Sequence, residues 1–302
     1  MMKFLSHKVK MSEMINKEKK SLLYIHLAVF FFGFPGVIGK LLPFSPLQLT
    51  WLRVLVASMS LFFIIKWQKE IFFRPDSSDL WLLLASGFLL SFHWTAFFQA
   101  VKVSTVAVGL FSYSTFPVFT VFIEPILLRL KFNKNNLIFA LICIFGIFLM
   151  VPEFKLTNRI FLGISWGLLS GLSFSFLAII NRKLSQRHSS LVLAFYQDTI
   201  AMFLLLPLIF WQKSSFAFNT KNITLLLFLG MVCTAGAHSL FIRGLRFIEA
   251  QTSSLISTLE PVYGIILGYF IVRETPDLRT IIGGLIIMSS VVAVSLGTVH
   301  RA

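Results

Sequence analysis

Long apolar runs separated by short polar connections dominate the sequence. Each run holds about 20 mostly apolar residues, the length that an α-helix needs to cross the hydrocarbon core of a bilayer. The connections leave little chain for a soluble domain, so the pattern predicts an all-α polytopic membrane protein with ten transmembrane helices. The predicted spans are 21–42, 46–65, 79–101, 104–128, 135–152, 160–181, 190–211, 222–243, 249–272 and 276–298.

The second half of this pattern repeats the first. When residues 96–150 are set beside 240–294, Pro117 falls on Pro261, each about halfway through its span. Because each half has five spans, an odd number, the second half enters the membrane in the opposite direction. Inverted repeats whose interrupted helices meet at the midplane are a common transporter plan. The predicted organisation is a basic tail (1–20) and two five-helix repeats (21–152 and 160–298).

Composition and charge agree with a membrane protein. Charged residues make up 13% of the chain, against roughly 25% in soluble domains. The net charge of +15 does not indicate nucleic-acid binding, because the basic residues lie between the apolar runs, where they set topology. With the N-terminus in the cytoplasm, 18 Lys and Arg residues lie on the cytoplasmic side and 8 on the other. We therefore expect both termini in the cytoplasm.

The basic tail has two interpretations. It is either a disordered anchor that fixes topology or a contact for lipid or another partner. The high content of Phe, Lys and Asn is typical of an AT-rich bacterial genome. We therefore expect a multi-pass protein of the bacterial cytoplasmic (inner) membrane, whose partners are the lipid bilayer and a small-molecule substrate.

The ninth run carries a Glu-Pro pair, Glu260-Pro261, at its middle. A carboxylate in the membrane is costly, and proline leaves one upstream carbonyl without its helical donor. Such a pair is tolerated where neighbouring protein or an aqueous cavity satisfies it. We expect this helix to line a transport cavity in which Glu260 binds a proton or a cationic group of the substrate. The aromatic wall would come from Trp94, Tyr113, Trp166 and Tyr263.

Glycine and proline interrupt other runs. Gly33, Pro35 and Gly36 in the first run loosen the helix, which indicates either a packing kink or a hinge beside the cavity. Pro117 and Pro261 are the corresponding interruptions of the fourth and ninth runs. A four-residue glycine spacing in the sixth run predicts a face for close helix packing: Gly163, Gly167 and Gly171.

Titratable side chains within other runs are further candidates. His93 and His238 either satisfy neighbouring backbone or hydroxyl groups or handle a proton, since imidazole titrates near neutral pH. Arg53 either snorkels towards the membrane surface or has a gating role, and Asp198 shares the gating interpretation. Inversion would place these two near opposite faces, so no direct pairing is expected. Gln99 is the last of these candidates. The spacing of the candidate residues predicts neither a metal site nor a cofactor.

Glu124 has a structural interpretation. It lies one turn from the cytoplasmic end of the fourth span, with Arg129 near. The sequence therefore predicts a salt bridge or an interfacial position for this carboxylate.

Several motifs in order resemble the drug/metabolite transporter superfamily, in particular its ten-span EamA branch. They are FGFPGVIGK in the first span, HWTAFFQAVKVSTVAVGLFSYSTFPVF in the third and fourth, and FIRGLRFIEAQTSSLISTLEPVYGIILGYFIVRETP in the eighth and ninth. The family usually shows Trp-Gly followed by polar residues in the first span, where this chain has Phe32-Gly33-Phe34-Pro35.

The resemblance implies a central cavity among spans 1, 3, 4, 6, 8 and 9. It also implies that spans 5 and 10 lie apart as a supporting or dimerising pair, so a homodimer is possible. Members of the family carry amino acids, nucleotide-like metabolites and drugs.

The expected function is a secondary transporter for a small organic metabolite, working by alternating access with proton or exchange coupling. No nucleotide-binding motif is visible, so ATP is not the direct energy source, and we expect no enzymatic activity. The alternatives are a membrane-embedded enzyme acting on lipid, favoured by the buried polar residues, and a passive channel. Transport without turnover of the cargo would exclude the enzyme, and an effect of counter-substrate would exclude the channel.

Overall fold

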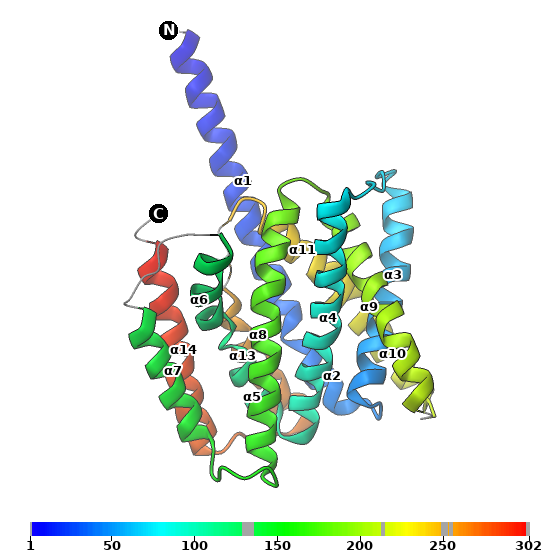
Figure 1. The fold of residues 1–302 in the computed structure, drawn as a ribbon, viewed down its shortest axis with the longest axis vertical. Helices are drawn as coiled ribbons and strands as arrows, with labels where there is room; N and C mark the ends of the chain where they lie inside the picture. Colours follow the sequence, from blue (N-terminus) through cyan, green and yellow to red (C-terminus); the bar gives the residue numbers. More distant parts are fainter. Residues whose placement is uncertain (1, 129–135, 213–214, 249–252, 254–255, 300–302) are drawn as a thin grey trace.

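The computed structural model describes residues 2–128, 136–212, 215–248, 253 and 256–299. All regular elements in these ranges are helices, and they pack as a bundle from which the first helix projects (Figure 1). Seven helical segments are long and apolar enough to cross a membrane, and three shorter apolar helices accompany them. The seven are Lys17–Leu41, Pro46–Trp67, Ser77–Val103, Val106–Leu127, Arg159–Ser185, Ser190–Gln212 and Thr220–Gly244; the shorter three are Leu137–Met150, Leu259–Val272 and Leu278–Ala293.

Local caps determine where helices of the first half begin. The Ser45 side chain accepts from the Gln48 N–H while the Gln48 side chain accepts from the Ser45 N–H, which satisfies two free donors of the first turn. Asp76 accepts from the Asp79 N–H at 2.7 Å, and this bond lowers the pKa of the exposed Asp76 carboxyl. The elements are α1 (Met2–Phe32), α2 (Phe34–Leu41), α3 (Pro46–Trp67), α4 (Ser77–Val103), α5 (Val106–Tyr113), α6 (Phe116–Leu128) and α7 (Asn136–Met150).

Two segments of the second half are π-helical, a wider winding that is frequent at functional sites. In the first of them, Thr234 donates its hydroxyl proton to the Leu229 carbonyl, five residues back. The elements are α8 (Arg159–Ser185), α9 (Ser190–Gln212), α10 (Thr220–Leu227), η1 (Phe228–Gly236), α11 (Ala237–Gly244), α13 (Leu259–Leu267), η2 (Gly268–Val272) and α14 (Leu278–Val299).

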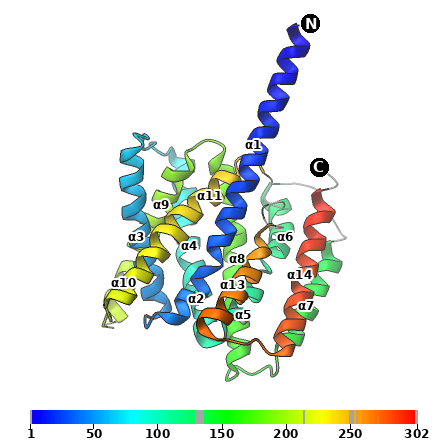
Figure 2. The same cartoon turned by 180° about the vertical axis from the view of Figure 1, so that it is seen from behind.

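Helices break beside the residues that the sequence marks as interruptions. Gly33 separates α1 from α2, whose first turn contains Pro35. The break between α5 and α6 lies just before Pro117, and α13 begins two residues before Pro261. A Cβ on Gly33 would lie 2.8 Å from the Tyr263 Cβ, so this break is where α1 approaches α13. The two helices lie side by side in Figure 2.

The basic tail is helical in the structure. α1 runs without interruption from Met2 to Phe32, so the expectation of a disordered tail is wrong. Residues 2–20 contain no Gly or Pro and are rich in Lys, Glu and Met, which are good helix formers.

Small residues let the helices approach closely. α8 packs on α4 and α5, where Cβ atoms on Gly163 and Gly167 would collide with Ser104 and Ser112. α7 and α14 pack together at one edge of the bundle (Figure 1), and a Cβ on Gly146 would lie 2.8 Å from the Gly283 carbonyl oxygen. The predicted packing role of the glycine stripe on α8 is confirmed.

Candidate functional site

Five buried side chains form a closed ring of aromatic contacts at the centre of the bundle. Successive ring centroids lie between 4.6 and 6.5 Å apart. Such distances suit edge and offset contacts between aromatic rings. We call this group the aromatic ring. Its members come from four helices: Phe32 of α1, His93 and Trp94 of α4, Phe174 of α8 and Phe241 of α11.

Tyr113 extends the aromatic ring towards the break between α5 and α6. Its ring centroid lies 5.3 Å from that of His93 and 5.6 Å from that of Phe174. Phe116, on the far side of the break, stacks on Tyr113 at 5.4 Å. The interruption before Pro117 therefore lies beside this central cluster.

The structure places other predicted wall residues away from the aromatic ring. Tyr263 contacts Phe30 of α1 at 5.4 Å and is half-buried. Trp166 on α8 is half-buried as well, and so is Gln99 on α4, a predicted binding or coupling candidate. Within the part of the chain that the structure describes, no aromatic contact joins Trp166 to the ring. Phe32, Phe174 and Phe241 were missed, since in a chain with 35 phenylalanines nothing distinguishes them.

Arg53 lies against the aromatic ring and is fully buried. Its guanidinium carbon is 3.4 Å from the centroid of the Trp94 ring, a cation–π contact. Its Nε donates to the Thr234 hydroxyl oxygen at 2.9 Å. The snorkelling interpretation is therefore wrong, because at this position α3 faces α4 and η1 and not the lipid.

Asp198 and His238 form a second polar group close to Arg53. The Asp198 Oδ1 and His238 Nδ1 atoms are 4.0 Å apart, and both side chains are buried. Arg53 interacts electrostatically with Asp198, although no salt bridge joins them in the described ranges. Among the described residues the two are not directly paired, as expected, although an electrostatic interaction links them.

Glu260 is buried on α13 and lies at the edge of the same cluster. Its carboxylate interacts electrostatically with Arg53 and with the Tyr113 hydroxyl. Among the described residues, its Oε2 atom has no hydrogen-bond partner. Arg53, Asp198 and Glu260 thus place one cation and two carboxylates at the centre of an apolar bundle, and we call these three residues the charged cluster.

His93 is satisfied locally. Its Nδ1 lies 2.8 Å from the Ser170 hydroxyl oxygen on α8. This matches the structural alternative predicted for a lone histidine in a membrane span. The bond also ties α4 to α8 next to the aromatic ring.

Glu124 forms the expected salt bridge, but with another partner. Its Oε1 lies 3.3 Å from the Nη1 atom of Arg182 at the end of α8. Arg129, the partner suggested by sequence, lies outside the described residues.

A polar clamp closes the face away from the N-terminus. Lys40 Nζ lies 3.3 Å from Glu274 Oε1 and donates to the Ser104 carbonyl at 2.6 Å. Glu274 Oε2 accepts from the Val106 N–H at 2.8 Å, where α5 begins. Sequence reasoning missed Glu274, since it lies in a connection with no distinguishing pattern.

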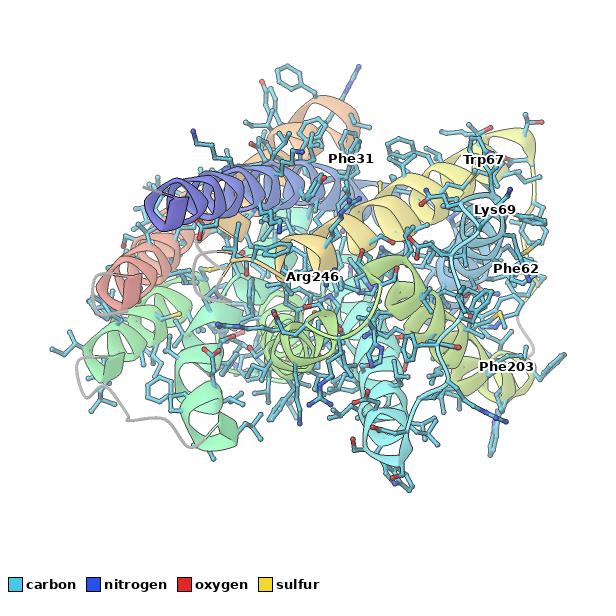
Figure 3. All side chains as sticks on the ribbon, turned by 90° about the horizontal axis from the view of Figure 1, so that it is seen from above. Phe31, Phe62, Trp67, Lys69, Phe203 and Arg246 are labelled. Carbon is cyan, nitrogen blue, oxygen red and sulfur yellow. The ribbon has the colours of Figure 1, made fainter. Side chains whose placement is uncertain are left out.

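The opposite face, which carries the N-terminus, is hollowed. A pocket of about 400 Å³ lies between α3, α9 and α11, and one of about 440 Å³ lies between the ends of α8 and α11. Arg246 lines both pockets and lies near the middle of this face (Figure 3). Trp67 and Phe203 lie at the periphery in the same view. The described residues contain no group of three or more His, Cys, Asp or Glu that could hold a metal ion.

A multi-pass helical bundle with charged groups buried at its centre is typical of membrane transporters. The model of the EamA-like transporter family matches residues 19–151 and 161–296, and the chain belongs to this family. The resemblance inferred from the sequence motifs is therefore confirmed.

Individual relatives are distant in sequence. The chain is 24% identical over 278 residues to an uncharacterized transporter, YxxF, of Bacillus subtilis, covering 89% of this chain and 88% of that protein. It is 27% identical over 208 residues to an S-adenosylmethionine uptake transporter of Rickettsia prowazekii, covering 67% of each. A solved crystal structure superposes with a TM-score of 0.68 at 15% identity, over 94% of this chain and 100% of that one. This likeness shows the fold alone.

Proposed function

We propose that the protein is a secondary transporter that moves a small organic metabolite across a bacterial cytoplasmic membrane by alternating access. The transport unit would consist of ten spans in two inverted five-helix repeats, 21–152 and 160–298. Both termini would lie in the cytoplasm. The charged cluster carries this proposal. Burying three ionisable side chains in a membrane bundle costs free energy. Binding of cargo or coupling ions by these side chains would explain why the protein tolerates this cost.

The asymmetry between the two faces supports alternating access. The clamp of Lys40 and Glu274 ties α2, α4 and α5 on one face, while the opposite face carries two pockets. Transport requires the reverse arrangement at another step, with the clamp open and the pockets closed. The helix breaks beside Pro117 and Pro261 lie next to the charged cluster, where they would act as hinges.

Glu260 and the aromatic ring would bind the cargo. The unpartnered Glu260 oxygen suits a cationic group, and aromatic faces attract cations and stack on flat heterocycles. S-adenosylmethionine, the cargo named for the Rickettsia relative, carries a sulfonium cation and an adenine ring. It is therefore the first cargo to test, beside amino acids and nucleosides, in a thermal-stabilisation screen of the purified protein.

The decisive experiment is uptake into proteoliposomes by wild type and Glu260→Gln. We expect the substitution to lower the uptake of a stabilising cargo at least about tenfold, because a neutral amide cannot replace the carboxylate. Glu153→Gln is the matched control, since Glu153 is an exposed carboxylate paired with Lys155. A wild-type rate with unchanged pH dependence in Glu260→Gln would refute the role of Glu260. Chemical conversion of the cargo would favour an enzyme, and flux indifferent to counter-substrate would favour a channel.

A further inference from the structure

One buried cation faces two buried carboxylates in the charged cluster. Arg53 interacts electrostatically with both Asp198 and Glu260. A buried charge is costly unless it is paired or neutralised. Because one guanidinium carries one charge, it can compensate only one carboxylate at a time. The other carboxylate needs a proton or a cationic ligand.

Asp198 has a partner suited to holding a proton. Its Oδ1 is 4.0 Å from His238 Nδ1. Among the described residues, both Asp198 oxygens and both His238 nitrogens lack hydrogen-bond partners. An approach of about 1 Å would bring the pair to hydrogen-bonding distance. A carboxylate and an imidazole can then share one proton.

A pocket on the N-terminal face is lined in part by the chain segment that contains His238. It has a volume of about 400 Å³, and Glu70 and His188 line it beside the surface loops. Its lining includes Gly236 and Ser239, which lie two residues before and one residue after His238 in the chain. The Ser239 hydroxyl is buried and has no hydrogen-bond partner in the described part of the chain. Water in this pocket would bring protons to within one residue of His238.

The pair is separate from Glu260. Asp198 lies on α9 and His238 on α11, whereas Glu260 lies on α13 beside Tyr113. Arg53 is held between them, because Trp94 supports its guanidinium face and Thr234 accepts from its Nε. The ionisable groups of neighbouring elements that face the pair or its pocket are Arg53, His93, Cys233, Glu260, Glu70, His188, Arg243 and Arg246.

We propose that Asp198 and His238 bind one proton, taken up through this pocket, and that this proton couples transport to the proton gradient. The proton passes from water to Asp198 Oδ1 and is shared with His238 Nδ1. Neutral Asp198 leaves the Arg53 charge to Glu260, which then releases a cationic cargo. When the site faces the opposite side of the membrane, the proton leaves to water on that side, Asp198 pairs again with Arg53, and Glu260 binds cargo again. The coupling role rests on the proposed transport function. The proton site is argued from Asp198 and His238 alone and does not depend on transport.

Infrared titration of purified protein in lipid bilayers tests the proton site without any cargo. The chain has four aspartates, so 13C labelling of aspartate isolates few carboxyl bands. In wild type, we expect a protonated-carboxyl band that disappears between about pH 5 and pH 8, the range in which imidazole changes its charge. In Glu260→Gln, Arg53 is left to Asp198 alone, so the band should disappear at a lower pH than in wild type. The band should be missing in Asp198→Asn. In His238→Gln, which keeps the carboxylate, its midpoint should shift by about one pH unit or more.

A band that survives Asp198→Asn, or a midpoint unchanged in His238→Gln, would overturn the proposal. Should Asp198→Asn not fold, the His238→Gln titration alone decides. In both cases the proposed transport function is tested separately, by uptake in Glu260→Gln.

Proteoliposomes test coupling with S-adenosylmethionine as the probe. An imposed proton gradient should stimulate wild-type transport several-fold, and Asp198→Asn should lose this stimulation. The same variant should keep counterflow, the exchange of labelled for unlabelled probe, which needs no net proton movement. Glu260→Gln should lose both. Gradient stimulation retained in Asp198→Asn would refute coupling at this site. No transport of S-adenosylmethionine by wild type would exclude this cargo, and the same test would then use a cargo that stabilises the protein in the thermal screen. The infrared band would still decide the proton site.

Discussion

Arg53 shows how much one buried side chain can depend on its partners. It is fully buried, stacks on Trp94 and interacts electrostatically with Asp198 and Glu260. Removing one member of a buried charged group is strongly destabilising, because it leaves an uncompensated charge in a medium of low polarity. The residues of the charged cluster should therefore not behave independently.

We expect Arg53→Gln to lower the free energy of unfolding by about 3–5 kcal/mol. The double variant Arg53→Gln/Asp198→Asn should lose less than the sum of the single variants, since it removes the uncompensated charge as well. Denaturant unfolding in bicelles measures both. Arg187→Gln, at an exposed arginine, is the control and should change stability by less than about 1 kcal/mol. Additive losses would show that Arg53 and Asp198 are independent.

Gly171 is a second residue whose role follows from contact. A Cβ there would lie 2.8 Å from the Tyr113 carbonyl oxygen, so Gly171→Ala forces α8 away from α5. We expect a loss of about 1–3 kcal/mol in unfolding free energy. Gly268→Ala is the control, because its Cβ would meet Val106 at an ordinary 3.7 Å. Equal effects of the two substitutions would contradict the close contact.

At the scale of elements, short helices depend on partners supplied by other segments. α5 has only eight residues, and the Glu274 carboxylate accepts from the N–H of its first residue, Val106. A carboxylate at a helix N-terminus satisfies a free donor and complements the helix dipole. The connection after η2 therefore supports the start of α5, directly next to the Lys40 ion pair.

Glu274→Ala should accelerate hydrogen exchange of the Val106 amide about tenfold, since a hydrogen bond to a charged acceptor is lost. Glu274→Gln keeps an acceptor oxygen and should have a smaller effect. Residue-resolved exchange mass spectrometry in detergent measures the difference. Unchanged exchange in Glu274→Ala would mean that the clamp does not protect α5 in solution.

At the scale of the whole molecule, the two pockets on the face that carries the N-terminus are lined by basic residues, namely Arg182, Lys183, Arg243 and Arg246. The positive-inside rule then predicts that this face is cytoplasmic. The clamp would close the outer face, and the pocket lined by Gly236 and Ser239 would open to the cytoplasm.

Cysteine labelling tests this orientation. Lys155→Cys, in an exposed connection on the clamp side, should react with a membrane-impermeant maleimide in intact cells. Arg187→Cys, on the pocket side, should react only after the membrane is permeabilised. The two native cysteines are buried and provide the background measurement. The reverse pattern would invert the topology and the direction of proton entry.

The sequence by itself predicted the all-helical membrane fold, the helix breaks near Gly33, Pro117 and Pro261, and the family. These features depend on local properties, namely apolar run length and the backbone limits of glycine and proline. The sequence also selected Glu260, because a carboxylate in an apolar run is conspicuous without any knowledge of its neighbours.

Only the tertiary structure brought Arg53 into contact with Trp94, placed Asp198 beside His238 and closed the aromatic ring from four helices. The bond from Arg53 to Thr234 joins residues 181 positions apart. Such contacts depend on how each helix is rotated and how far a side chain reaches. Apolar spans face protein on one side and lipid on the other, and hydrophobicity does not distinguish these faces. The sequence therefore located the charges, and the packing of the helices decided which of them meet.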